Sequence, residues 1–132
     1  MRLYSVAVTS LAVGAPLKWT DNLVAHHDIP EVRSTRRGVA RAASWTGVVR
    51  IAVIRALHLE LGCSVHEAVA LSDALLQAPN GTVMLGGRLT LAVDRAALER
   101  ELQARLADVL ESAPRPRRGR PARRLSGSPV QE

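Results

Sequence analysis

The stretch SWTGVVRIAVIRALHLELGCSVHEAVALSDALL, residues 44–76, decides the fold because it predicts two consecutive helices with a sharp break between them. Ser44 is a typical N-cap for the first helix, and Gly62 stands where a helix terminus favours glycine. Ser64 and Glu67 then form an S-x-x-E capping box, in which each side chain can bond a backbone N–H of the other residue. The stretch therefore predicts a mainly α-helical fold, with its most secure helix boundary at Ser64.

Apolar residues show how these two helices are expected to pack. In the first helix they cover more than one stripe, which implies contact with several neighbours. They are Val48, Val49, Ile51, Ala52, Ile54, Leu57 and Leu61. The second helix is expected to turn one face inward, made of Val65, Ala68, Val69, Leu71, Leu75 and Leu76.

Two shorter helices are expected before this stretch. Ser5 or Thr9 can cap the first, which runs to the helix-breaking Gly14. The second is expected from about Pro16 to His27, because proline is tolerated at the start of a helix, and Pro30 prevents its continuation. On a helical wheel its packing side holds Leu17, Trp19, Leu23 and Val24, and its exposed side holds Lys18, Asp21, Asn22 and Ala25.

Residues 32–43 contain glycine and several arginines, and they predict a small hairpin around Arg37-Gly38. Between residues 31 and 55 the arginines face a single acidic residue, Glu31. These arginines are Arg33, Arg36, Arg37, Arg41, Arg50 and Arg55. The segment is therefore interpreted as a basic patch that suits a polyanion.

The second half of the chain predicts a hairpin followed by a helix. Asn80-Gly81 supplies a turn into two short strands between residues 82 and 93, joined at Gly86-Gly87. Asp94 is expected to cap a helix that ends near Glu111. Its leucines recur at intervals of four, at Leu98, Leu102 and Leu106. Such a stripe favours packing within the chain or pairing with another helix in a coiled coil.

Charge is unevenly distributed along the 132 residues, whose formal net charge is +6. Residues 1–113 carry twelve Lys and Arg against eleven Asp and Glu, whereas residues 114–132 carry six against one. A single cysteine, Cys63, cannot form an intramolecular disulfide, which fits a reducing cytoplasm. No apolar run has transmembrane length, so no membrane partner is expected.

Arginine is concentrated near the end of the given sequence. Between Pro114 and Arg124 six of eleven residues are arginine, and the centre reads Arg118-Gly119-Arg120-Pro121. This centre resembles an AT-hook. An extended Arg-Gly-Arg can follow the floor of an A·T-rich minor groove, whose negative potential attracts guanidinium groups. Arg117, Arg118, Gly119 and Arg120 are therefore DNA-binding candidates. The alternative is a basic arm that only solubilises; for either role the composition of residues 113–132 predicts disorder.

Residues 5–76 resemble the DNA-binding domain of MerR-type regulators, a winged helix-turn-helix. The landmarks are Gly14, Pro30, Arg41, Leu61-Gly62 and the capping box. The resemblance implies that the second helix enters a major groove, that the wing grips the flanking backbone, and that the C-terminal helix pairs two subunits as a homodimer. The chain departs from the family at Asp21 and Asn22, where an Arg-Tyr or Arg-Phe pair is usual.

The expected organisation has three parts. Residues 1–78 form the winged helix-turn-helix, residues 79–112 a β-hairpin and a C-terminal amphipathic helix that is a candidate for dimerisation, and residues 113–132 a disordered basic tail.

Contacts with double-stranded DNA are expected from the second helix and the wing. Lys18 can bind a phosphate or guanine, and Asn22 can bond adenine through its amide. His26 is a further DNA-binding candidate on the same helix. Arg36, Arg37 and Arg41 are expected to hold phosphates. The alternative for the helix is an ordinary solvated face.

Other functional classes find little support in the sequence. His26, His27 and Asp28 are adjacent, but no nucleophile, second acid or phosphate cradle accompanies them, so no catalytic residue and no enzyme activity are expected. His58, Cys63 and His66 offer three ligands where structural zinc normally takes four. No metal and no other cofactor are therefore expected.

The sequence thus predicts a sequence-specific DNA-binding protein, a bacterial transcriptional regulator in the cytoplasm, associated with the nucleoid. The alternative is an antitoxin-like or adaptor protein, which binds a protein partner through its C-terminal helix and tail and DNA only secondarily.

Overall fold

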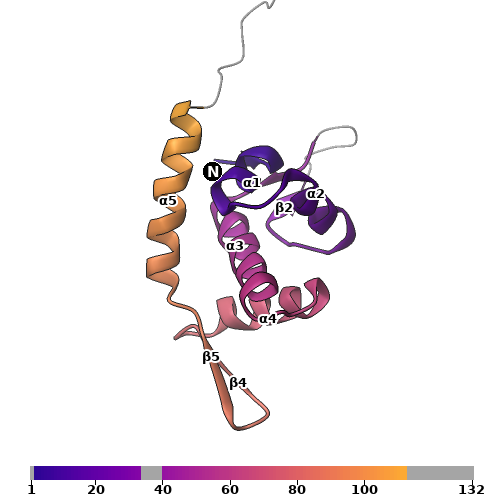
Figure 1. The fold of residues 1–132 in the computed structure, drawn as a ribbon, viewed down its shortest axis with the longest axis vertical. Helices are drawn as coiled ribbons and strands as arrows, with labels where there is room; N and C mark the ends of the chain where they lie inside the picture. The colour runs from indigo at the N-terminus through magenta and orange to yellow at the C-terminus, as the bar shows by residue number, and fades with distance from the viewer. Residues whose placement is uncertain (1, 34–39, 113–132) are drawn as a thin grey trace, which may run out of the picture.

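The computed structural model describes residues 2–33 and 40–112, and this part is mainly helical. The helices are α1 (Val6–Val13), α2 (Leu17–His26), α3 (Trp45–Glu60), α4 (Val65–Gln77) and α5 (Arg95–Ser112). The strands are β1 (Tyr4–Ser5), β2 (Val32–Arg33), β3 (Ala42–Ala43), β4 (Thr82–Leu85) and β5 (Leu89–Ala92). In Figure 1, α5 runs beside the other helices and the β4–β5 hairpin projects from the lower end of the molecule. Among the described helices, none is both long enough and apolar enough to cross a bilayer.

A tight turn joins α1 to α2. Ser5 is the N-cap of α1, because its hydroxyl accepts the N–H of Val8 at 3.1 Å. Thr9, the alternative cap, is instead buried within the helix. Gly14 ends α1 with φ at +83°, a left-handed conformation that glycine adopts without a steric penalty, and Pro16 follows as the N-cap of α2.

The buried side of α2 differs from the predicted one at two positions. Leu23 and Val24 are buried as expected, but Leu17 is 50% exposed and Thr20 is fully buried. The threonine can be buried because its hydroxyl donates to the carbonyl of Pro16 at 3.4 Å, so its polar group is satisfied within the helix. The prediction that Leu17 packs inward is therefore wrong, and Thr20 occupies the centre of the packing side.

A three-stranded antiparallel sheet lies beside α1 and α2, with the strand order β1-β3-β2 (Figure 1). Val32 pairs with Ala43 and Arg33 with Ala42, so the two strands of the hairpin predicted for residues 32–43 are present. Its turn at Arg37-Gly38 lies outside the described residues. The third strand, β1, pairs with β3 and was not predicted, because two residues are too few to show an alternating pattern.

The predicted boundaries of α3 and α4 are confirmed. Ser44 caps α3 by accepting the N–H of Gly47, and Gly62 follows its end with φ at +71°. The capping box is complete: the Ser64 N–H donates to Glu67 Oε1 at 3.0 Å, and the Glu67 N–H donates to Ser64 Oγ at 3.1 Å. The pKa of Glu67 lies below its ordinary value because the backbone N–H and then the hydroxyl of Ser64 bond the carboxylate.

The core is centred on α3, as its broad apolar surface predicted. Val48, Val49 and Ile54 have no exposed surface, and Ile51 is 1% exposed. At its first turn α3 comes very close to the sheet: a Cβ on Gly47 would lie 3.0 Å from the Cβ of Glu31. Glycine inside a helix costs about 1 kcal/mol relative to alanine. Here it permits a close backbone approach, because a side chain at this position would require its neighbours to move by a few tenths of an ångström.

Arg50 is buried within this junction. Its guanidinium donates to both carboxylate oxygens of Glu31, at 2.8 Å and 3.0 Å, and to Asp73 of α4 at 3.0 Å. Burial alone would lower the pKa of Arg50, but the two carboxylates offset this effect and raise it above its ordinary value. Arg50 therefore ties α3 to α4 and to the segment before β2.

The leucine stripe of α5 packs within the chain. Leu102 is 1% exposed and Leu106 is 7% exposed, and Leu102 belongs to the same hydrophobic cluster as α3. Asp94 caps the helix as predicted, since its carboxylate accepts the N–H of Ala97 at 3.0 Å. The indole N–H of Trp45 donates to Glu99 at 2.9 Å and links the start of α3 to α5.

The predicted hairpin is confirmed as β4 and β5, paired from Thr82↔Ala92 to Leu85↔Leu89. Gly86 and Gly87 in its turn have φ at +61° and +75°, the positive values that a tight hairpin turn requires at both central residues.

Candidate nucleic-acid interface

One side of α2 presents the three predicted DNA-binding side chains to solvent. Lys18, Asn22 and His26 are all exposed, and they are separated by four residues each, so they share one face of the helix. Nδ1 of His26 lies 2.9 Å from the carbonyl oxygen of Asn22, which holds the imidazole against its own helix. The structure therefore brings these three residues together on one surface, which we call the α2 face.

The α2 face is bounded on one side by α4. His26 and Asn22 border a hollow of about 350 Å³, together with His27 and Val65. The ring centroids of His27 and His66 lie 6.4 Å apart across this boundary. His26 thus stands at the edge of the α2 face, whereas Lys18 lies a full two turns away from it.

Arg41 lies on the other side of the α2 face. It is exposed immediately before β3, and it lines a hollow of about 370 Å³ together with Asp21 of α2 and Ser5. Within residues 2–33 and 40–112 no ion pair joins Asp21 to Arg41. The arginine is therefore available to an external anion, although a carboxylate stands nearby and weakens the local positive potential.

Arg33 lies close to Arg41 in the strand pair, although it was not among the predicted site residues. It pairs with Ala42, so Arg33 and Arg41 lie at the same end of the β2–β3 pair. Its guanidinium donates to the carbonyl of Pro30 at 3.1 Å, and the side chain is otherwise exposed. The signal that could have identified it is its position in the arginine-rich segment, directly before the turn.

Six predicted contact residues lie outside the described part of the chain. They are Arg36, Arg37, Arg117, Arg118, Gly119 and Arg120.

Two arginines assigned to the basic patch do not contribute to this surface. Arg50 is only 7% exposed and is neutralised by two carboxylates. The guanidinium carbon of Arg55 lies 4.8 Å from the ring centroid of Trp19, so its charge rests on an aromatic face. The patch was overestimated because the number of arginines in a segment does not show which of them face inward.

Trp19 and Trp45 both have structural roles in the described residues. Trp19 packs against the hydrophobic cluster, with its ring centroid 6.1 Å from that of His58, and Trp45 bonds Glu99. Neither is free to stack on a nucleotide.

The histidines and cysteine considered as metal ligands do not converge. His58 Nδ1 lies 2.8 Å from the carbonyl oxygen of Cys63, a contact that occupies one ring nitrogen. His66 is exposed on α4. Across residues 2–33 and 40–112 no three His, Cys, Asp or Glu side chains are grouped closely enough to hold a metal ion.

Comparison of the chain with protein-family models, with curated proteins and with solved structures gives no match.

Proposed function

We propose that this protein is a winged helix-turn-helix transcriptional regulator that binds double-stranded DNA at a preferred sequence. In this proposal α2 lies in the major groove, the β2–β3 pair contacts the neighbouring phosphates, and the basic tail extends the contact into the minor groove.

The observation that carries the proposal is the composition of the α2 face. Lys18 and Asn22 are exposed one helical turn apart, and in the described residues neither makes an ion pair or a side-chain hydrogen bond that would occupy it. Asparagine can bond N6 and N7 of adenine at once, and lysine can bind guanine or a phosphate. Ala25 lies on the same exposed side and would allow close approach of the backbone to the groove wall.

The arrangement around α2 gives further support. A short turn at Gly14 joins it to α1, and the antiparallel β2–β3 pair follows it, the order expected of a helix-turn-helix with a wing. Arg33 and Arg41 lie at one end of that pair, where they could hold phosphates on either side of the groove. This arrangement also agrees with the resemblance to MerR-type regulators.

The carboxylate of Asp21 restricts which DNA sequences α2 can bind. A carboxylate in the major groove repels phosphate, but it can accept a hydrogen bond from the N4 amino group of cytosine. We therefore expect the bound sequence to contain a cytosine near the adenine that Asn22 contacts.

Selection of bound duplexes from a random pool tests the proposal. The expected result is enrichment of one sequence, and an inverted repeat would indicate a two-fold dimer. On the selected duplex, Asn22→Ala should weaken binding by roughly tenfold or more and relax the preference at one position. Gln103→Ala, which removes an exposed amide from α5, is the matched control and should bind as wild type.

A second candidate is the antitoxin-like or adaptor protein, which the acidic Asp21 on the α2 face and the nearly neutral charge of residues 1–113 favour. It predicts weak retention of every duplex, with no enriched sequence and no effect of Asn22→Ala. Measuring random and A·T-rich duplexes at two salt concentrations separates the two candidates, since only the regulator should keep a sequence preference at the higher salt.

A further inference from the structure

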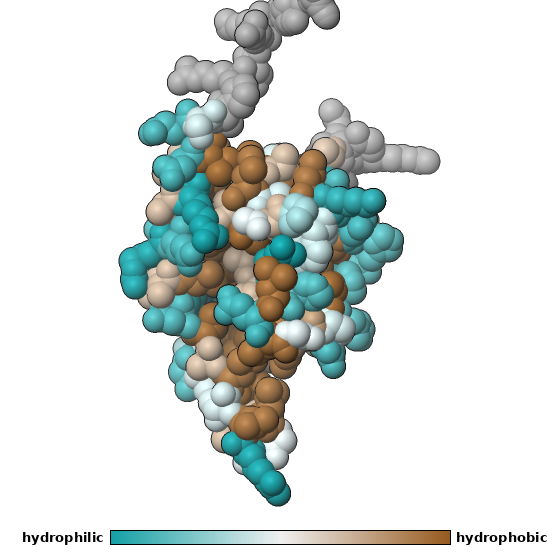
Figure 2. All heavy atoms as spheres, in the orientation of Figure 1, coloured by the Kyte–Doolittle hydropathy of each residue, from teal (hydrophilic) through white to brown (hydrophobic). Residues whose placement is uncertain are grey.

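Exposed apolar side chains gather at the lower end of the molecule. Leu59 and Leu61, at the end of α3, are 60% and 58% exposed, and Met84 and Leu89, on the β4–β5 hairpin, are 66% and 68% exposed. These four are half of the eight large apolar residues that are exposed in the described part of the chain. Figure 2 shows apolar surface continuing from the middle of this face down to the hairpin. Clustered exposure of this kind usually marks a contact surface.

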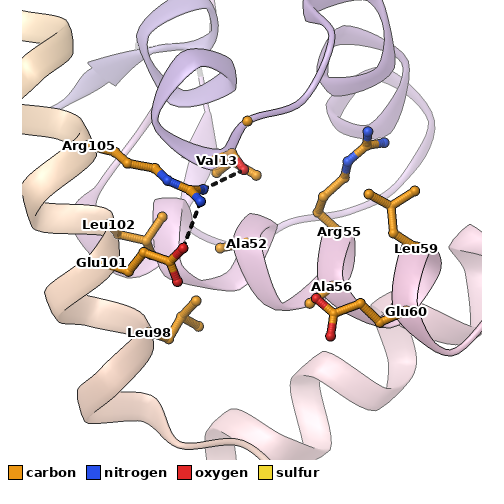
Figure 3. Close-up of a pocket in the computed structure, with 11 residues that line it drawn as sticks. Val13, Ala52, Arg55, Ala56, Leu59, Glu60, Leu98, Glu101, Leu102 and Arg105 are labelled. Atoms are coloured by element: carbon orange, nitrogen blue, oxygen red, sulfur yellow. Dashed lines mark hydrogen bonds and ion pairs between the residues drawn. The ribbon is translucent and has the colours of Figure 1, made fainter.

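Beside these residues a groove runs along α3. One hollow of about 340 Å³ lies between α3 and α5, and another of about 330 Å³ lies between α3 and β5. They share Ala56, Glu60 and Leu98, so they adjoin along α3, and we call the two together the α3 groove. Figure 3 shows the hollow between α3 and α5, with Leu98 and Leu102 of α5 on one side and Ala52 and Ala56 of α3 on the other.

The α3 groove and the hairpin carry opposite, unpaired charges. Glu60 is exposed where the two hollows meet, and it makes no ion pair within residues 2–33 and 40–112. By contrast, Glu101 at the upper end of the groove is already paired with Arg105 at 2.7 Å (Figure 3). Arg88, in the turn of the hairpin, is exposed and has no ion-pair partner among the described residues either.

The hairpin also needs cover that the chain itself does not provide. An isolated two-stranded hairpin is at best marginally stable in water. Val83 and Leu91 pack against the core from one side of this hairpin, whereas Met84, on the opposite side, and Leu89, on the same side but next to the turn, face solvent. A partner that buried these two side chains would stabilise β4 and β5.

We propose that the β4–β5 hairpin of one copy of this chain docks in the α3 groove of a second copy, and that the second hairpin docks reciprocally. Met84 would cover Leu59 and Leu61 on the α3 wall of the groove, Leu89 on the other side of the hairpin would face the opposite wall, and Arg88 would reach Glu60 of the other copy.

A second copy is favoured over an unrelated partner because the chain carries both halves of the contact. The hairpin offers apolar side chains and a cation, and the groove offers apolar side chains and the unpaired Glu60. The other charged groups that line the groove are already engaged: Arg55 lies over Trp19, Glu101 pairs with Arg105, and Asp94 caps α5. A two-fold axis uses each half twice, as closed dimers do. The leucine stripe of α5 is not available for pairing, since Leu102 and Leu106 are buried within the chain. This inference does not depend on DNA binding.

Charge reversal tests the contact on the full-length chain in the absence of DNA. Wild-type protein should sediment as a dimer at micromolar concentration. Arg88→Glu and Glu60→Arg should each raise the dimer dissociation constant about tenfold or more, because each turns two attractive pairs into repulsive ones. Arginine at the end of α3 is compatible with the helix dipole, so Glu60→Arg is expected to fold normally. Arg100→Glu, on the exposed side of α5, makes the same charge change elsewhere and should leave the dissociation constant unchanged.

Mixing the two variants gives the decisive measurement. In a mixed dimer one contact pairs native Arg88 with native Glu60, and the other pairs the introduced glutamate with the introduced arginine. Mixed dimers should therefore form with a dissociation constant close to that of wild type, whereas each variant alone stays monomeric. The proposal is overturned if wild type is monomeric, if both single variants dimerise like Arg100→Glu, or if mixing restores nothing. If the dimer did not form, the proposed DNA-sequence preference of α2 would still be tested separately, by selection of bound duplexes from a random pool.

Discussion

Arg50 of α3 and Glu31, which precedes β2, form a two-bond ion pair in which the Nε and Nη2 groups donate at 2.8 Å and 3.0 Å. The Arg50 side chain is 9% exposed and that of Glu31 is 20% exposed, so this pair is shielded from solvent. A planar guanidinium matches a carboxylate in this geometry, which fixes the relative orientation of the two segments. The pair holds the segment between α2 and the sheet against the central helix.

Arg50→Ala is expected to lower the free energy of unfolding by about 3 kcal/mol, because it leaves a partly buried carboxylate without its partner. Arg50→Lys should recover only part of the loss, since an ammonium group cannot make two parallel bonds. Urea denaturation at neutral pH measures both. Arg100→Ala is the control and should change stability by less than about 0.5 kcal/mol. An Arg50→Ala protein as stable as this control would show that the pair contributes nothing.

Glu99→Gln is expected to make stability less dependent on pH. The pKa of Glu99 is lowered first by the hydrogen bond from the Trp45 indole, with burial opposing and Arg95 assisting. A carboxylate with a lowered pKa in the folded state stabilises the protein above its unfolded pKa, and this contribution disappears as pH falls through the folded value. Wild type should therefore exceed Glu99→Gln by about 1 kcal/mol at pH 7, and the difference should be smaller at pH 3.

Tryptophan fluorescence during urea denaturation at the two pH values provides this measurement. Glu101→Gln is the comparison, since Glu101 pairs with Arg105 on the exposed side of the same helix and should matter little at either pH. A difference between wild type and Glu99→Gln that is as large at pH 3 as at pH 7 would mean that the charge of Glu99 is not its cause.

The features of this fold that could be predicted from the sequence are those set by contacts between residues close together in the chain. The helix boundaries at Ser44, Ser64 and Asp94 were predictable because each cap bonds a backbone N–H three residues further on. The pairing of Arg50 was not, because its partners lie 19 and 23 residues away in the sequence. A pattern within one segment carries no information about such contacts.

In the candidate nucleic-acid interface, too, some features could be predicted from the sequence and others could not. Helical periodicity predicted that Lys18 and Asn22 share an exposed face, and both are exposed. Periodicity could not reveal that Thr20 would take the inward position expected of Leu17, since that depends on a hydrogen bond to Pro16. Nor could it show that Arg55 lies over Trp19 and does not join the basic surface.

Leu102→Ala is expected to lower the free energy of unfolding by about 3 kcal/mol, because truncation of a fully buried leucine removes apolar contact and leaves a cavity. Since Leu102 packs against its own chain, the loss should be the same at every protein concentration. Leu110→Ala, at a position that is 40% exposed on the same helix, should cost much less. Thermal denaturation over a hundredfold range of concentration distinguishes this packing from a coiled coil, for which the loss would depend on concentration.

Removal of residues 114–132 is expected to reduce the salt dependence of DNA binding while a preferred sequence remains detectable. The deleted segment holds six arginines. If all of them contact phosphate, the slope of log affinity against log salt should fall by about five units. Fluorescence anisotropy with the selected duplex, at several salt concentrations, gives the slope. A truncated protein that lost all sequence preference would contradict the assignment of base recognition to α2.

The contact at Gly47 limits how this junction can vary. A methyl group there would meet Glu31 at 3.0 Å and the side chain of Ala43 at 3.2 Å, so α3 would have to shift away from the strand beneath it. Arg50 stands one turn further along the same helix, and the shift would lengthen its bonds to Glu31. Substitution of Gly47 would thus weaken both the packing of α3 against Ala43 and the ion pair between Arg50 and Glu31. Saturation mutagenesis of position 47 should accordingly favour glycine over larger residues, while the outward positions of α2 accept many residues without loss of the fold.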